Sequence, residues 1–173
     1  MKAKISKLGF GLSSIAGSGN FKHQQRLIKY SIECGITHFD VAPYYGHGDA
    51  EKILGDVLST CYDEVTITTK FGLMPFNGGK TGKILRKTFR PLFRKFRLLK
   101  GVISSVVRHT HNPVVSNFSA NDIISSIDRS IQNLRRPVDI FLLHDVSSEI
   151  ATNFLIVNSM NEIKKMGKAL AIG

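Results

Sequence analysis

The sequence predicts an α/β protein with a parallel sheet, and two observations lead to this class. Short apolar runs alternate with amphipathic segments along the 173-residue chain, and polar residues close three of those runs. Strands that alternate with helices form a parallel sheet, either an open doubly wound sheet or a barrel. With 42% hydrophobic residues, the chain is long enough to bury one domain core of ordinary size.

The first half of the chain predicts three strands separated by two helices. An apolar run broken by glycines predicts a strand within residues 7–15, and apolar side chains at helical spacing predict a helix over residues 23–35. Residues 36–42 have the length and composition of a buried strand, and residues 49–59 place their aliphatic side chains on one helical face. The β-branched residues 64–70 predict the third strand.

The second half continues the alternation. Residues 119–134 predict the best-marked helix, because Ser119 is a good N-cap and isoleucines recur every four residues behind it. Residues 138–144 predict a fourth buried strand. Residues 149–167 predict one helix with lysines in its last turn, and residues 168–173 begin a fifth strand.

The net charge of +11 comes from one segment. Residues 77–116 contain ten lysines and arginines and no acidic residue, while the other residues carry 14 basic against 13 acidic side chains. Apolar residues recur every three or four positions between these charges, so a helix there would be amphipathic and cationic, interrupted at Pro91. We expect a basic amphipathic insertion over residues 77–116 within one domain that spans residues 1–173.

The partners expected for this segment are few. A loop that folds its apolar side onto the domain is the preferred interpretation. Contact between residues 80–108 and a membrane surface or an acidic polymer is the alternative. Nucleic acid is the weakest option, because aromatic stacking residues are few and no known binding module is present.

Two further expectations concern the compartment and metals. No apolar stretch is long enough to span a membrane and no continuous signal core follows the amino terminus, which favours a cytoplasmic protein. Cys34 and Cys61 are too few for a disulfide framework and lack metal-ligand spacing, and the His109 and His111 pair has no third ligand in view. We expect no metal.

Polar residues at strand ends predict a site. Asp40, Lys70 and His144 lie at the carboxyl ends of the second, third and fourth predicted strands. In a parallel sheet these ends face the same way, so the three side chains can converge, and Tyr45 in the loop after Asp40 can lean over them. No glycine-rich GxGxxG turn follows the first strand, so the Rossmann dinucleotide fingerprint is absent.

Such a constellation suits proton transfer. A phenol exchanges protons poorly at neutral pH, but a nearby ammonium such as Lys70 favours the phenolate, and Asp40 can hold that lysine. Tyr45 would then act as the acid or base, and His144 would orient or polarise a substrate oxygen. The matching reaction is hydride transfer between a nicotinamide and a carbonyl or alcohol, because a developing alkoxide needs one well-placed proton.

Three segments of the chain resemble a known family. "HFDVAPYYGHGDAEKILG" from residue 38, "TITTK" from residue 66 and "DIFLLHD" from residue 139 resemble the aldo-keto reductases. The resemblance implies a (β/α)8 TIM barrel, NADP or NAD as cofactor, and a catalytic tetrad of Asp40, Tyr45, Lys70 and His144. It also implies that the nicotinamide binds near Asp40 and near Gly11 and Leu12, the two residues that follow the first strand.

The resemblance also implies a substrate class and an incomplete barrel. "APYYGHG" with "LLHD" is most similar to the branch that oxidises aldose sugars, so an aldose or a small aldehyde or ketone is expected. A complete barrel of this kind needs about 250 residues. We therefore expect a barrel truncated to about the first four β/α units plus the fifth strand, without the loops that bind the cofactor's pyrophosphate and adenosine.

Two alternatives follow from that incompleteness. The chain could be a catalytically silent barrel fragment that acts as an interaction or membrane-surface module through its basic segment. Alternatively, self-assembly or a separate second half could complete the barrel. Cofactor binding and the size of the purified protein separate these possibilities.

Overall fold

The structure, a computed structural model, describes residues 5–15, 20–59, 64–74, 114–115 and 118–173. All of these residues except Val114 belong to a compact unit of Met1–Met74 and Val115–Gly173. The predicted basic insertion at residues 77–116 lies almost wholly outside the described residues and stays a prediction. The short strand β4 (Leu73–Met74) precedes the insertion in the sequence, and the short strand β5 (Val114–Val115) lies near its carboxyl-terminal end.

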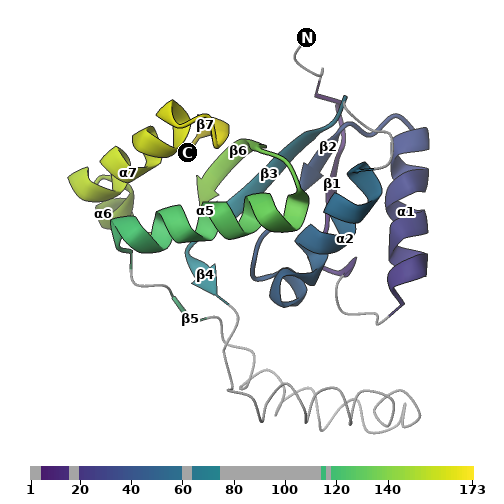
Figure 1. The fold of residues 1–173 in the computed structure, drawn as a ribbon, viewed down its shortest axis with the longest axis horizontal. Helices are drawn as coiled ribbons and strands as arrows, with labels where there is room; N and C mark the ends of the chain where they lie inside the picture. Colours follow the sequence, from purple (N-terminus) through teal and green to yellow (C-terminus); the bar gives the residue numbers. More distant parts are fainter. Residues whose placement is uncertain (1–4, 16–19, 60–63, 75–113, 116–117) are drawn as a thin grey trace, which may run out of the picture. The chain divides into compact units, whose positions relative to one another are not determined.

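Five parallel strands form the sheet, in the same order in space as in the sequence (Figure 1). The order is β1-β2-β3-β6-β7, with each neighbouring pair parallel. The strands are β1 (Gly9–Gly11), β2 (His38–Asp40), β3 (Thr66–Phe71), β6 (Val138–Leu143) and β7 (Ala169–Ile172). All five strands predicted from the sequence are therefore present. Four lie within their predicted ranges, and β3 begins two residues later and ends one residue later than predicted.

Helices connect the strands and pack against one another in sequence order, α1 on α2, α2 on α5 and α5 on α7. None of the helices in the described ranges combines the length and apolar character needed to cross a membrane. The helices are α1 (Phe21–Glu33), the 3₁₀ helix η2 (Tyr45–Gly48), α2 (Asp49–Leu58), α5 (Ala120–Leu134), α6 (Ser148–Ala151) and α7 (Phe154–Lys165).

The strand order decides between the two predicted architectures. A doubly wound sheet reverses direction at a switch point and carries helices on both faces. Here every connection steps to the next neighbour in the same direction, and right-handed crossovers then place all helices on one side. A singly wound parallel sheet of this kind is part of a (β/α)8 barrel, of which the described residues provide five consecutive strands.

The two faces of the sheet differ because successive side chains alternate between them. The face toward the helices carries large buried side chains that form the core with the helices: Phe39, Ile67, Phe71 and Phe141. The strand registers join Gly11, Asp40, Thr68 and Ile140 in one row across the sheet. This row lies on the opposite face, which is the interior of the barrel.

Capping explains where two helices begin. Ser119 accepts a hydrogen bond from the backbone N–H of Asp122 and starts α5, as predicted. The isoleucine stripe of α5 packs into the core, with Ile131 only partly buried. Helix α1 begins two residues earlier than predicted, because Asn20 accepts from the backbone N–H of His23. Near the end of α1, Cys34 is a free and exposed thiol.

The prediction of one helix over residues 149–167 is wrong. The structure has two helices, α6 and α7, with Asn153 between them in an extended conformation. The side chain of Asn153 accepts from the backbone N–H groups of Leu155 and Ile156, which makes it the N-cap of α7. The capping bonds of Asn153 outweigh the apolar periodicity that runs through it.

Gly55 provides a test of the packing between α2 and α5. A Cβ at this position would lie 2.4 Å from the carbonyl oxygen of Asn133 and 2.9 Å from Cα of Leu134. Helix propensity alone would make Gly55→Ala stabilising by about 1 kcal/mol. We expect overpacking to reverse the sign and lower the free energy of unfolding by about 1–3 kcal/mol, measured by urea denaturation. Gly11→Ala is the control, because its Cβ would meet no heavy atom within 4 Å. If both variants lost the same free energy of unfolding, overpacking at Gly55 would not be the cause.

Candidate active site

The four residues of the predicted tetrad meet at the carboxyl ends of neighbouring strands. Asp40 ends β2, Lys70 is the penultimate residue of β3, and His144 directly follows β6. Tyr45 begins η2, five residues after Asp40. The predicted convergence of these side chains is therefore present in the structure.

Lys70 is the centre of this group. Its ammonium nitrogen donates to Oδ1 of Asp40 at 2.5 Å and to the carbonyl oxygen of Val41 at 3.3 Å. The side chain of Lys70 is 12% exposed and that of Asp40 is 37% exposed. The same nitrogen lies 5.2 Å from the ring centroid of Tyr45, within the range of a cation–π contact. Lys70 therefore connects the carboxylate of β2 with the phenol of η2.

His144 completes the group and contacts Tyr45. The two rings meet edge to face, with centroids 6.1 Å apart and an interplanar angle of 88°. Burial lowers the pKa of His144 below its ordinary value, and the positive charge of Lys70 lowers it further. Asp40 and Asp145 act in the opposite direction but more weakly. His144 is therefore neutral at neutral pH, with one ring nitrogen as donor and the other as acceptor.

A glycine that the sequence analysis did not single out places His144 against β3. Gly72 has φ 137°, and a Cβ there would lie 2.7 Å from the carbonyl oxygen of His144. The close approach lets the backbone N–H of His144 donate to the carbonyl oxygen of Phe71 at 2.6 Å. The only sequence signal was a glycine two residues after Lys70, in "KFG".

The turn that carries Tyr45 has an unusual backbone. Gly46, His47 and Gly48 all have left-handed φ values, at 61°, 60° and 87°. The backbone N–H of Tyr45 donates to the carbonyl oxygen of Ala42 at 3.0 Å. The ring of Tyr44 contacts that of Tyr45 at 6.5 Å between centroids, whereas the Lys70 ammonium lies over the ring of Tyr45. The geometry therefore singles out the same tyrosine as the sequence.

The two residues expected near a nicotinamide differ in their surroundings. Gly11 is the last residue of β1 and pairs in register with Asp40. A Cβ at Gly11 would meet no heavy atom within 4 Å, so space is open beside Asp40 on the interior face. Leu12 is fully buried in the core, and its backbone N–H donates to the carbonyl oxygen of Asp40 at 2.9 Å. Only Gly11 therefore borders open space.

A polar cluster that the sequence analysis missed lies below the tetrad. His38 Nδ1 is 2.8 Å from the hydroxyl of Thr66, and Nε2 is 3.3 Å from that of Thr68. The Thr66 hydroxyl donates to the carbonyl oxygen of Thr37, so it accepts from Nδ1–H, and Nε2 then accepts from Thr68. The one signal for this cluster is the spacing of two residues between His38 and Asp40, which places both on one face.

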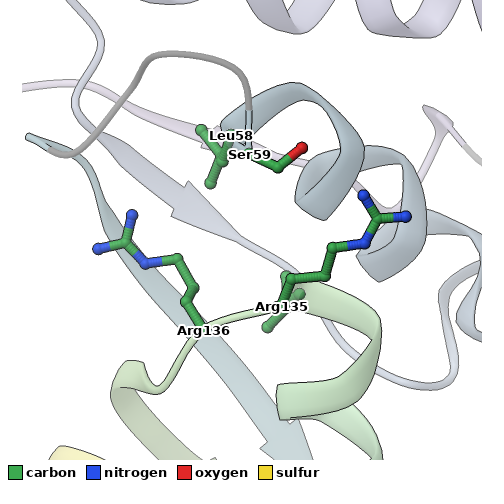
Figure 2. A pocket seen from close by; sticks show the side chains of 5 residues that line it. Leu58, Ser59, Arg135 and Arg136 are labelled. Atoms are coloured by element: carbon green, nitrogen blue, oxygen red, sulfur yellow. The ribbon is translucent and has the colours of Figure 1, made fainter.

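A pocket elsewhere does not coincide with this chemistry. Figure 2 shows it beside the ends of α2 and α5, where Leu58, Ser59, Leu134, Arg135 and Arg136 line it. Helices that return antiparallel to the strands end at the amino ends of those strands, opposite the tetrad. Arg135 is paired with Asp56 at 2.7 Å. Within the described residues no group of three histidine, cysteine or acidic side chains could hold a metal.

Comparison with curated proteins identifies oxidoreductases as relatives. The chain is 28% identical over 150 residues to pyridoxal 4-dehydrogenase from Microbacterium luteolum, which covers 82% of the chain and 40% of that protein. It is 28% identical over 74 residues to pyridoxine 4-dehydrogenase from Escherichia coli (strain K12), covering 39% of the chain and 26% of that protein. The chain therefore spans less than half the length of these relatives.

Solved structures share the fold. The glycerol dehydrogenase from Gluconobacter oxydans matches with a TM-score of 0.72 at 19% identity, over 100% of this chain and 45% of that one. The holo form of an aldo-keto reductase from Bacillus halodurans matches with a TM-score of 0.70 at 18% identity, over 100% of this chain and 50% of that one. These matches agree with the barrel topology of the five strands.

The match to a family model decides the relationship. The model of the aldo/keto reductase family matches residues 7–173, which include all five parallel strands and the four residues at their carboxyl ends. With nearly the whole chain matched, and with oxidoreductases of this family among its relatives, the chain belongs to the aldo/keto reductase family.

Proposed function

We propose that this protein interconverts a carbonyl and an alcohol by hydride transfer with NADP or NAD, using Asp40, Tyr45, Lys70 and His144. One observation carries the proposal: the Lys70 ammonium is bonded to Asp40 at 2.5 Å and lies 5.2 Å from the centre of the Tyr45 ring. Family membership supports an oxidoreductase. The arrangement of the four side chains supports hydride transfer coupled to proton transfer.

Proton transfer is assigned to Tyr45. In the reducing direction its hydroxyl would give a proton to the carbonyl oxygen, and in the oxidising direction the phenolate would take a proton from the alcohol. The phenolate has to exist at one stage of either direction, and the Lys70 ammonium lies 5.2 Å from the centre of its ring. Asp40 holds Lys70 in place and prevents the ammonium from folding away into solvent.

His144 would orient the substrate. A neutral imidazole can donate one N–H to the substrate oxygen without placing a second positive charge beside Lys70. Its edge-to-face contact with Tyr45 keeps the two rings next to each other, so that both could reach one substrate oxygen. The substrate oxygen would then receive a hydrogen bond from His144 and exchange a proton with Tyr45.

The cofactor would lie on the interior face beside Asp40. No heavy atom of the described residues lies within 4 Å of a Cβ built on Gly11, which leaves room beside Asp40, and Leu12 would keep the strand end in place through its bond to Asp40. The nicotinamide, when bound, supplies or accepts the hydride. Gly11 and Asp40 are the residues of this chain that would hold it there.

The proposed substrate is an aldose or another small aldehyde, ketone or alcohol. The similarity of "APYYGHG" and "LLHD" to aldose dehydrogenases supports a sugar. The relatives named pyridoxal 4-dehydrogenase and pyridoxine 4-dehydrogenase support an aldehyde or alcohol on an aromatic ring. A screen should therefore include aldoses, pyridoxal and simple aldehydes.

Titration of the purified chain with NADPH and with NADH tests the proposal directly. We expect nicotinamide fluorescence to report saturable binding with a dissociation constant in the range of roughly 1 µM to 1 mM that enzymes show for substrates. The control is the same titration in heat-denatured protein. A folded chain that binds neither cofactor would instead support the alternative of a catalytically silent fragment.

Replacement of Tyr45 tests the assigned proton donor. We expect Tyr45→Phe to reduce kcat by at least about 100-fold, because general acid–base catalysis contributes that much or more, with little change in the melting temperature. Tyr44→Phe is the matched control, since it removes the neighbouring phenol. Turnover that survives in the Tyr45 variant and is lost in the Tyr44 variant would reverse the assignment.

The lowered pKa of His144 predicts a direction of pH dependence. NMR titration should place the protonation midpoint of His144 below 6.5, so kcat should fall as the pH drops through that midpoint. The unfolded chain binds this proton more readily, so the same protonation should also lower stability in acid. Lys70→Met should raise the midpoint, because it removes a neighbouring positive charge. A midpoint that does not move would exclude Lys70 as a cause.

A further inference from the structure

We infer that Glu51 is a positioning residue that fixes Tyr45 in its place over Lys70. Glu51 lies in the first turn of α2 and its side chain is fully buried. The inference rests on the proposed function in one respect: it assumes that the position of Tyr45 relative to Lys70 determines turnover. The side chain of Glu51 is hydrogen-bonded to Thr69 and Asn133. Glu51 would therefore act on Tyr45 through these two residues.

The carboxylate of Glu51 has two neutral donors. Its Oε1 accepts from the hydroxyl of Thr69 at 2.9 Å, and its Oε2 accepts from Nδ2 of Asn133 at 2.9 Å. Burial of a carboxylate is costly unless hydrogen bonds replace its water. The N-terminal turn of a helix adds a favourable partial positive charge. A charged side chain is therefore kept in the core by specific partners on two other elements.

The two partners place this contact next to the tetrad. Thr69 directly precedes Lys70 in β3, and alternation along the strand points Thr69 toward the helices and Lys70 into the barrel interior. Glu51 follows Gly48, the last residue of the Tyr45 turn, by three positions. One hydrogen bond therefore joins the residue beside Lys70 to the helix that begins where the Tyr45 turn ends.

The Tyr45 turn is joined to β3 at both of its ends. Left-handed φ at His47 is uncommon for a residue other than glycine, and the hydrogen bond from the His47 backbone N–H to the Tyr44 carbonyl oxygen is long, at 3.4 Å. The upstream end is held by β2, where the Val41 backbone N–H donates to the Thr68 carbonyl oxygen at 2.9 Å. The bond between Glu51 and Thr69 holds the downstream end to the same strand, β3.

Asn133 holds the helix from its outer side. Its side chain donates to Glu51, and its carbonyl oxygen lies where α2 approaches most closely, at Gly55. A Cβ on Gly48 would lie 3.5 Å from Nδ2 of Asn133, so the same amide lies near the end of the Tyr45 turn. The first turn of α2 is thus held between β3 and α5.

The test is fluorine NMR of the full chain labelled with fluorotyrosine. The Tyr45 resonance is identified by its loss in Tyr45→Phe. We expect one Tyr45 resonance in the natural sequence, and a broadened or divided one in Glu51→Gln and in Thr69→Val. Thr69→Ser keeps the hydroxyl donor, and Asp49→Asn removes an acidic residue from the same turn of α2 without altering the Glu51 carboxylate. Both should leave the resonance unchanged.

Turnover provides the second readout. In the two disruptive variants kcat should fall by about 10- to 100-fold, the loss expected for a misplacement of about 1 Å, while KM for the cofactor stays the same. Thr69→Ser should restore kcat. If the natural sequence shows no turnover, the proposed function fails, but the NMR measurement still decides whether Glu51 fixes Tyr45.

The result that would overturn the inference is an unchanged Tyr45 resonance in folded Glu51→Gln and Thr69→Val proteins. Equal changes in Asp49→Asn and Thr69→Ser would overturn it as well, because they would indicate general loosening of α2. Asn133→Ala removes one donor and leaves the Thr69 bond. If either disruptive variant does not fold, this milder change replaces it, and its Tyr45 resonance should broaden.

Discussion

The ion pair between Lys70 and Asp40 is the interaction on which the site depends. It joins the carboxyl ends of β2 and β3, and each charge is partly removed from solvent. Loss of one partner would leave a half-buried charge without compensation, which is far more costly than loss of a surface pair. Because the ammonium also faces the Tyr45 ring, the pair fixes both the geometry and the electrostatic character of the proposed site.

This pair is possible because the sheet is parallel and its strands follow one another in order. Equal orientation brings the carboxyl ends together, and registers without reversals keep Asp40 close to Thr68 and Lys70. The helices on one face provide the packing, with Gly55 allowing the closest approach. The opposite face of the sheet, toward the barrel interior, carries polar side chains. Among them, His38 and its partners Thr66 and Thr68 lie below the tetrad.

Much of the fold, and the proximity of the four proposed site residues, could be predicted because most of these features leave a local mark. Asp40, Lys70 and His144 end apolar runs, and Ser119 precedes a clear amphipathic stripe. Asn153 could not be predicted as a cap, since apolar periodicity continues through it. Gly72 and His38 were missed for another reason: their roles arise from contacts with strands far away in the sequence, His144 in one case and Thr66 in the other.

The strand registers also have a consequence for the order in which the site assembles during folding. His38 and Thr66 are 28 residues apart, whereas Ile67 on β3 and Asp139 on β6 are 72 residues apart. Closing the longer loop costs roughly 0.6 kcal/mol more for each doubling of length, and distant contacts form more slowly than local ones. Asp40, Tyr45 and Lys70 belong to the locally connected strands, so we expect His144 to join the group last.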